Sequence, residues 1–111
     1  MISRHWKGTA KPQEAENYIK HLETDTFPRL SKIKGFIRAY ILTRRLNRGT
    51  EFLIVTIWES MDAIEAFAGP AADKAVVPGE VQAMMIEYDT KVVHYEVEAS
   101  YTPGRSSSKN S

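Results

Sequence analysis

The sequence predicts an α+β fold whose strands and helices follow the order β-α-β-β-α-β. The central observation is a run of β-branched and aromatic side chains, residues 50–58, which leads directly into a helix-forming segment. A second observation is that stretches of helical periodicity alternate with strand-like stretches along the chain. With right-handed crossovers, this order gives a four-stranded antiparallel sheet with both helices on one face.

The first strand and the first helix are expected within residues 2–28. Residues 2–8 have the pattern of a strand. Pro12 suits the first position of a helix. The apolar side chains that follow repeat at helical spacing, as Ala15, Tyr18, Ile19 and Leu22. Pro28 is expected to end or kink this helix near Thr26.

A hairpin and a second helix follow. Gly35 opens a strand over residues 36–46, and Asn47-Arg48-Gly49 turns the chain into the central strand. Ser60 is the expected N-cap of the second helix. The side chains expected to point inward from this helix are Met61, Ile64, Phe67 and Ala68. Gly69-Pro70 provides the stop signal at its end.

The remaining sequence predicts one more strand and a tail. Residues 71–89 are expected to hold short helical pieces broken at Pro78-Gly79. Residues 91–98 are the final strand, with Val93, Tyr95 and Val97 on one face and His94 and Glu96 on the other. The domain is therefore expected over residues 1–98. Residues 99–111 are Ser-rich and poor in core-forming side chains, which predicts a disordered tail.

The two middle strands predict a homodimer. Both are apolar on both faces, whereas two helices can cover only one face of the sheet. An apolar face of this size usually marks an interface. The residues expected on it are Phe36, Tyr40, Leu42, Leu53, Val55 and Ile57. We expect two copies to pack sheet against sheet.

Composition excludes several classes of function. The 111 residues contain no cysteine, so disulfides and cysteine nucleophiles are excluded. His5, His21 and His94 show no metal-ligand spacing, and the six glycines form no phosphate-binding loop.

Residues 1–48 carry 11 basic and 4 acidic side chains, whereas residues 49–98 carry 2 basic and 10 acidic side chains. Pairing of oppositely charged strands explains this asymmetry better than nucleic-acid binding. No run reaches membrane-spanning length, and a cytoplasmic location is expected.

Several motifs along the chain occur together in one known family. They include Ile-x-Arg-x-Trp-x-Gly at residues 2–8, Thr-Glu-Phe-Leu at residues 50–53 and Trp-Glu-Ser-Met-Asp-Ala-Ile at residues 58–64. The same pattern includes Gly35, Phe-Ala-Gly at residues 67–69, Lys-Ala-Val at residues 74–76 and Val-His-Tyr-Glu-Val at residues 93–97. With these motifs the chain resembles the antibiotic biosynthesis monooxygenase family over residues 1–98. The resemblance implies a ferredoxin-like protomer and a dimeric α+β barrel. It leaves the activity open, because this scaffold hosts several chemistries.

The resemblance also places particular residues. Trp58 matches the tryptophan that lines the pocket of quinone-forming members, and Ile54 stands where those members have an asparagine. Haem-degrading members have a tryptophan in the second helix and a histidine ten residues later. Those positions are occupied here by Phe67 and Val77, so the haem ligand of that mechanism is missing.

Three residues are candidates for catalysis. His5 has the chemistry of a general base near neutral pH, or it is a hydrogen-bonded strand histidine. Trp58 is a redox participant or a pocket wall, and Tyr95 is a proton donor or a core tyrosine. The candidate substrate-binding residues are Ile54, Phe67, Met84, Met85, Tyr40, Arg38 and His94. For Arg38, Tyr40 and His94, expected on the barrel side of the sheet, the alternative is a polar network inside the dimer.

These observations predict a monooxygenase that oxidises a small aromatic, phenolic or polyketide-like substrate with O2, without metal or flavin. An electron-rich phenol can supply the electrons itself, and the site then needs a base, an aromatic wall and a desolvated pocket. Two alternatives remain. One is a haem-binding or haem-degrading protein of the same fold, and the other is a ligand-binding dimer without catalysis.

Overall fold

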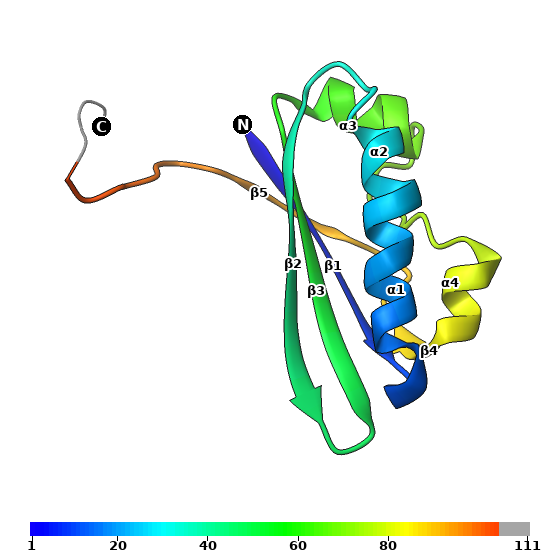
Figure 1. Cartoon of the computed structure of the whole chain (residues 1–111). Coiled ribbons are helices and arrows are strands. Elements are labelled where there is room, and N and C mark those ends of the chain that lie inside the picture. The colour runs from blue at the N-terminus through cyan, green and yellow to red at the C-terminus, as the bar shows by residue number, and fades with distance from the viewer. Residues whose placement is uncertain (105–111) are drawn as a thin grey trace.

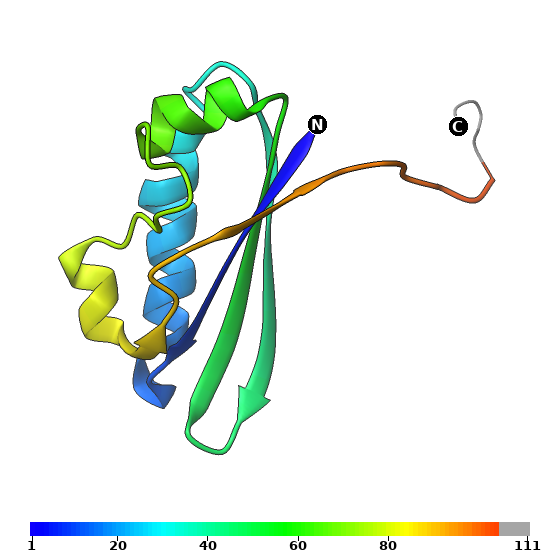
Figure 2. The same cartoon turned by 180° about the vertical axis from the view of Figure 1, so that it is seen from behind.

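The computed structural model describes residues 1–104 and has the expected α+β architecture, with one antiparallel sheet covered by helices. The elements in chain order are β1 (Ile2–Ala10), η1 (Pro12–Glu14), α1 (Ala15–His21), η2 (Leu22–Thr26), α2 (Phe27–Leu30), β2 (Phe36–Leu46), β3 (Gly49–Trp58), α3 (Met61–Ala68), α4 (Gly79–Met84), β4 (Met85–Tyr88) and β5 (Val93–Glu96). Figures 1 and 2 show α1, α2, α3 and α4 on the same face of the sheet. The other face is bare.

The strand order is β2-β3-β1-β4, with β5 also paired to β1. The sheet has five strands rather than the expected four because the edge beside β1 is divided. β5 lies opposite residues 2–5, and β4 lies opposite residues 8–10. Between them the Asp89 N–H donates to the carbonyl oxygen of Lys7 at 2.9 Å. The alternating pattern over four residues is too short to have indicated β4 from the sequence.

A bulge near the start of β2 changes which side chains face the helices. Phe36 pairs with Trp58 and Arg38 with Ile57, so one residue of β2 is extra. Phe36 therefore lies on the helix side, where its ring packs edge-on against Trp58 at a centroid distance of 5.2 Å. The prediction that Phe36 belongs to the bare face was wrong. Beyond the bulge, Tyr40 lies opposite Val55 and Leu42 lies opposite Leu53.

Pro28 was expected to end or kink the first helix near Thr26, and the helical path continues through it after a change of geometry. α1 leads into the π-helical turn η2 and then into α2, which ends at Leu30. In η2 the Phe27 N–H donates to the carbonyl of Leu22, five residues earlier. This wider turn directly precedes Pro28, which has no N–H to donate to the turn before it. The chain thus accommodates the proline without leaving the helix.

The second predicted helix and its caps are confirmed in α3. The Ser60 hydroxyl oxygen accepts a hydrogen bond from the Ala63 N–H at 3.3 Å, and Gly69 ends the helix with a φ of 84°. The loop before β2 packs tightly on α3: a Cβ atom on Gly35, whose φ is 100°, would lie 2.6 Å from the Ala63 Cβ. Gly35 therefore allows a close approach as well as an unusual backbone angle.

The helix-facing core forms two clusters. One is built around α1, β3 and α4 and contains Ala10, Tyr18, Leu22, Phe52, Ile54, Val81 and Met85. The other surrounds α3 and contains Ile2, Leu30, Trp58, Ala63, Ile64 and Ala72. Phe27, in the first turn of α2, packs against both clusters. The space between the two clusters holds the cavity described below.

The chain beyond β5 leaves the body of the protein (Figure 1). Residues 99–104 are exposed and form neither helix nor strand. The rest of the expected tail, residues 105–111, lies outside the described residues, so its disorder stays a prediction. Among residues 1–104, no helix has the length and apolar character needed to cross a membrane.

Candidate functional site

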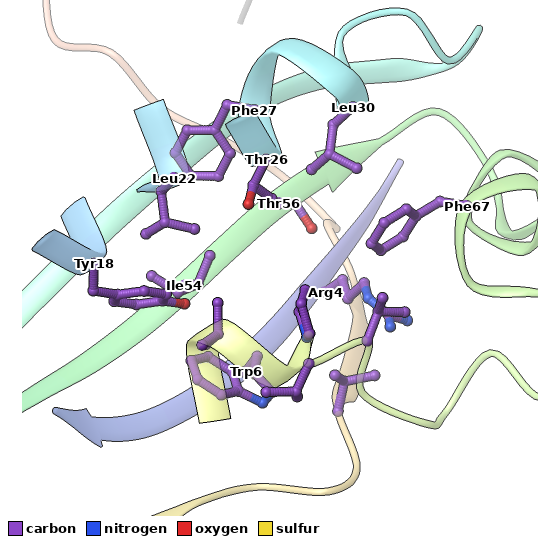
Figure 3. A pocket seen from close by; sticks show the side chains of 15 residues that line it. Arg4, Trp6, Tyr18, Leu22, Thr26, Phe27, Leu30, Ile54, Thr56 and Phe67 are labelled. Carbon is purple, nitrogen blue, oxygen red and sulfur yellow. The ribbon is translucent and has the colours of Figure 1, made fainter. Parts of the chain in front are cut away.

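A cavity lies between the helices and the sheet (Figure 3). The empty space within it is about 600 Å³, part of it open to solvent. The lining is mainly apolar and includes four aromatic rings, those of Trp6, Tyr18, Phe27 and Phe67. The other lining residues are Arg4, Leu22, Thr26, Leu30, Ile54, Thr56, Val76, Val77, Pro78, Val81 and Val92. Small-molecule sites have this character: mostly apolar, with a few polar groups.

The sheet supplies one wall through two adjacent cross-strand pairs. Arg4 of β1 lies opposite Thr56 of β3, and Trp6 lies opposite Ile54. Alternate residues of a strand share a face, so all four side chains point toward the helices. The pair of Arg4 and Thr56 makes one end of this wall polar, and the pair of Trp6 and Ile54 makes the other end apolar (Figure 3).

The first helix supplies the opposite wall. Tyr18 of α1, Leu22 and Thr26 of η2, and Phe27 of α2 all line the cavity. Burial raises the pKa of the Tyr18 hydroxyl, so this side chain is neutral at physiological pH. The π-helical turn lies at the middle of this wall, and such turns frequently occur at functional sites.

The connection between α3 and α4 closes a third side. Val76, Val77 and Pro78 line the cavity here, and the Gln82 side-chain amide donates to the carbonyl oxygen of Val77 at 2.9 Å. Val81 of α4 extends this apolar surface. Since these residues come from a segment without regular structure, sequence periodicity gave no indication of their place in the site.

Among residues 1–104, Arg4 is the one charged side chain that lines the cavity, and it is only 5% exposed. Its Nη1 donates to the carbonyl oxygen of Ala72 at 2.6 Å and to Nε2 of His94 at 3.0 Å. Its Nη2 donates to the carbonyl oxygen of Lys74 at 3.0 Å. The Cζ atom also lies 5.6 Å from the centre of the Phe67 ring, in reach of a cation–π contact.

Burial lowers the pKa of Arg4 to about 10. The guanidinium is still charged at neutral pH, because that value lies well above 7. Its hydrogen-bond acceptors in the protein are two neutral carbonyls and an imidazole. The site therefore contains a buried positive charge in a mainly apolar enclosure.

The faces of β5 are the reverse of those expected. His94 lies opposite Arg4 and Tyr95 lies opposite Ser3, so His94 is on the helix side and Tyr95 on the bare side. The expectation of His94 on the barrel side was wrong. The two faces of this short strand differ too little in polarity for the sequence to show which of them packs against the helices. His94 does not line the cavity itself, but it contacts Arg4, which does.

His5, the candidate base, is separated from the cavity by the sheet. It follows Arg4 in β1, so its side chain points to the bare face. Its Nε2 atom lies 2.9 Å from the Ser3 hydroxyl oxygen, and its ring meets that of Tyr95 edge-on at 5.1 Å. The expectation that His5 acts on a substrate between helices and sheet is therefore wrong, because its side chain lies on the opposite face of the sheet. Arg38 and Tyr40 also lie on the bare face, as expected.

Trp58 supports the cavity without lining it. It is fully buried, and its Nε1 donates to the Thr56 hydroxyl oxygen at 2.8 Å. Its ring stacks on that of Phe67 at a centroid distance of 5.9 Å. Phe67 and Thr56 line the cavity, so Trp58 holds two lining residues from behind.

Of the other expected substrate contacts, Ile54 and Phe67 line the cavity. Met84 and Met85 instead belong to the neighbouring core cluster. Sequence reasoning missed Arg4, Thr56 and Tyr18 as site residues. The alternation of β1 placed Arg4 and Trp6 together on one face, and this was the available signal for Arg4. In the part of the chain described, no group of three or more His, Asp or Glu side chains could hold a metal ion.

The family model for antibiotic biosynthesis monooxygenases matches residues 1–78. The chain belongs to this family. The match includes β1, the helical wall, β3 and Phe67, which together form most of the cavity. No curated protein matches the sequence.

Solved structures of family members share the fold at low sequence identity. A Bacillus cereus protein described as an antibiotic biosynthesis monooxygenase has a TM-score of 0.67 at 19% identity, covering 95% of this chain and 98% of its own. SnoaB, a cofactor-independent oxygenase from Streptomyces nogalater, has a TM-score of 0.62 at 14% identity, with coverages of 89% and 94%. The haem degrader MhuD from Mycobacterium tuberculosis has a TM-score of 0.57 at 20% identity, with coverages of 92% and 100%. At these identities the likeness shows the fold alone.

Proposed function

We propose that this protein of the antibiotic biosynthesis monooxygenase family oxidises a small aromatic, phenolic substrate with O2, without metal or flavin. The observation that carries the proposal is the cavity lined by four aromatic rings between the sheet and the helices. Flat rings can stack there and shed their water. The cofactor-independent chemistry of SnoaB, a protein of similar fold, supports the same class of reaction.

The reaction needs no electron source besides the substrate. A phenolate gives one electron to O2, and the resulting pair combines so that a C–O bond forms at a ring carbon bearing hydrogen. The peroxide then loses water: one oxygen atom stays on the ring as a quinone carbonyl, and the other leaves as H2O with the two substrate hydrogens. The protein contributes orientation and exclusion of water.

The substrate must reach its ionised form without His5, which lies on the other face of the sheet. Arg4 and Tyr18 are the titratable groups that line the cavity. Neither is a base at neutral pH, because Arg4 is charged and Tyr18 is neutral. Ionisation of the substrate therefore depends on its own acidity and on the positive charge of Arg4.

Oxygen consumption tests this proposal. Protein free of metal, flavin and haem is incubated with a panel of polycyclic phenols, and uptake above the non-enzymatic rate is expected for at least one. Phe67→Ala removes a cavity ring and should lower kcat/KM at least tenfold. Phe36→Ala removes a ring that packs edge-on against Trp58 without lining the cavity, and it is the matched control, expected to lose stability but keep turnover. No uptake with any phenol would refute catalysis.

A ligand-binding dimer without catalysis is the second candidate. It is favoured by the lack of a base among the residues that line the cavity. This alternative predicts that phenols bind, quench tryptophan fluorescence and raise Tm, yet cause no oxygen uptake. Haem degradation is less well supported, because the cavity residues Phe67 and Val77 stand where the haem-degrading members carry a tryptophan and the iron-ligating histidine.

The bare face of the sheet supports assembly as a homodimer. Tyr40, Leu42, Val93 and Tyr95 lie on this face and are 47%, 48%, 52% and 57% exposed. Leu53, Val55 and Ile57 of β3 lie on the same face, where Val55 and Ile57 are 9% and 8% exposed. A second copy covering it would remove a large apolar area from water. A protein of similar fold is described as a dimeric ferredoxin-like protein, in keeping with this arrangement.

A further inference from the structure

We propose that Arg4 anchors an anionic oxygen of the ligand, so that the cavity selects aromatic acids: ring systems that carry a carboxylate or an ionised phenol. This inference rests on the proposed function, since it names the class of molecule that the same cavity takes. It also assigns a task to Arg4 that the expected base, His5, does not perform.

The first argument is the uncompensated charge of Arg4. Buried charges in proteins are normally paired, because removing an ion from water is costly. Arg4 is only 5% exposed, yet within residues 1–104 no carboxylate lies in ion-pair distance of it. Its partners are neutral groups: two carbonyls, the His94 ring and the face of Phe67. An anion entering the cavity would meet the positively charged guanidinium of Arg4, which is shielded from water and not neutralised by a carboxylate.

The second argument is the donor count. A guanidinium has five N–H donors in a planar fork that matches the two oxygens of a carboxylate. Three hydrogen bonds are formed, two from Nη1 and one from Nη2. This leaves Nε–H and one N–H of Nη2 without an acceptor among the residues that the structure describes. The Nε and Nη2 atoms form one edge of the guanidinium, and side-on bidentate binding of a carboxylate uses this edge.

The third argument is the polar end of the cavity. Thr56 lies opposite Arg4 in the β1–β3 ladder and also lines the cavity. Its hydroxyl oxygen accepts from Trp58 Nε1, which leaves its own O–H free to donate. An anionic oxygen at this end would therefore meet the guanidinium and a hydroxyl donor. The aromatic body would extend toward Trp6 and Ile54, which form the apolar end.

The contact with His94 fits this role for Arg4. Because an arginine can only donate, Nε2 of His94 must accept, and the imidazole is neutral. His94 thus holds the guanidinium in place and leaves its charge uncompensated, whereas an Asp or Glu at this position would neutralise it. His94 is accordingly a positioning residue, and Arg4 is the residue that touches the ligand.

The first experiment uses the unaltered protein with two ligands of nearly equal shape, 2-naphthoate and its neutral counterpart 2-naphthamide. Binding at pH 7.5 is followed by tryptophan fluorescence and calorimetry. We expect naphthoate to bind at least tenfold more tightly. Equal binding, or tighter binding of the amide, would overturn the anion anchor while leaving the aromatic cavity intact. Failure of both ligands to bind would count against the cavity and the proposed function together.

A second arm distinguishes the two sources of the anion. 2-Naphthol absorbs differently when ionised, so its ionised fraction in the complex can be read from the spectrum at the same pH. If the ionised fraction of bound 2-naphthol is at least tenfold above that of free 2-naphthol, the cavity also binds phenols in their ionised form. If naphthoate binds more tightly than naphthamide but bound 2-naphthol is not ionised, the ligands are restricted to aromatic carboxylates. That outcome still supports the anchoring role of Arg4.

The second experiment removes the charge. Arg4→Met should abolish the preference for naphthoate while changing the affinity for naphthamide no more than about twofold. Arg4→Lys should restore part of the preference, because it returns the charge without the fork. Lys7→Met is the matched control: Lys7 is exposed on the other face of the same strand, and its loss should change neither affinity. If Arg4→Met does not fold, the comparison of ligands in the unaltered protein still decides the proposal.

Discussion

The guanidinium of Arg4 and the imidazole of His94 meet at 3.0 Å across the neighbouring strands β1 and β5. The contact joins the two ends of the domain sequence, since β1 opens it and β5 is its last strand. It also fixes the protonation state of His94, because a protonated imidazole would have no acceptor to offer. We therefore expect the position of Arg4 to depend on pH, because protonation of His94 removes one of its acceptors.

Acid should destabilise the protein through His94. Burial, then the charge of Arg4, lowers the pKa of His94; His5 acts in the same direction and Asp73 against it. A histidine with a lowered pKa binds its proton more readily when unfolded, so the stability it contributes is present above about pH 6.5 and is lost as pH falls. Tm should therefore drop between pH 7 and pH 5.

The variant His94→Gln should flatten this pH dependence, since a glutamine oxygen can accept from Arg4 at any pH. His5 is the matched control, because burial also lowers its pKa although it lies on the other face. His5→Gln should leave the acid sensitivity that depends on His94 in place. An equally steep loss of Tm in His94→Gln would show that the contact with Arg4 does not matter for acid stability.

Gly35→Ala should destabilise the fold by about 1–3 kcal/mol. The added methyl group would meet the Ala63 Cβ atom at 2.6 Å, and a φ of 100° is unfavourable for alanine. Urea unfolding monitored by circular dichroism measures the change. Gly79→Ala is the control, because nothing lies within 4 Å of the position its methyl group would occupy. Similar stabilities for the two variants would contradict the close packing of this loop on α3.

Leu42→Glu should dissociate the proposed homodimer. The side chain is 48% exposed in the single chain, so a charge there is tolerated by the fold but not by a covered apolar interface. We expect a cost of about 3 kcal/mol, roughly a hundredfold in the dissociation constant. Light scattering at micromolar concentration gives the mass. Thr24→Glu, on the exposed surface of η2, should leave it unchanged. A monomeric unaltered protein would refute the interface.

Val77→His should create a haem site, which we expect the unaltered chain to lack. Val77 lines the cavity, and a histidine there would offer an imidazole to iron. Haem titration followed in the visible spectrum should give a strong band for the variant and only weak, non-specific changes for the unaltered protein. Val97→His, outside the cavity, is the control. A strong band in the unaltered protein would reinstate haem as a candidate ligand.

The sequence predicted the fold well because its signals are local. Each signal can be read within a few residues. Ser60 caps a helix, Gly69 ends it, and β3 is apolar on both of its faces. Register is different, because it depends on how distant strands align. One bulge moved Phe36 to the helix side, and the register of β5 reversed the expected faces of His94 and Tyr95.

The site was harder to predict because its key residues have ordinary local contexts. Arg4 resembles any strand residue until its neighbours Ala72, Lys74 and His94 are known, and these lie about seventy to ninety positions away. His5 attracted attention through its chemistry, whereas its place on the sheet excludes it from the cavity. The expected cytoplasmic location and the lack of a nucleic-acid partner stay predictions.

The π-helical turn η2 makes the helical wall dependent on chain length. Residues before it, such as Tyr18, and residues after it, such as Phe27, belong to two helical phases that both point into the cavity. Deleting one residue, for instance Glu23, would return the turn to α-helical geometry and rotate everything beyond it by about 100° relative to α1. Insertions and deletions at this point would thus reshape the cavity by changing which side chains of α2 face it, although no lining residue is itself replaced. That gives a protein engineer a coarse control of the cavity's shape that point substitutions do not offer.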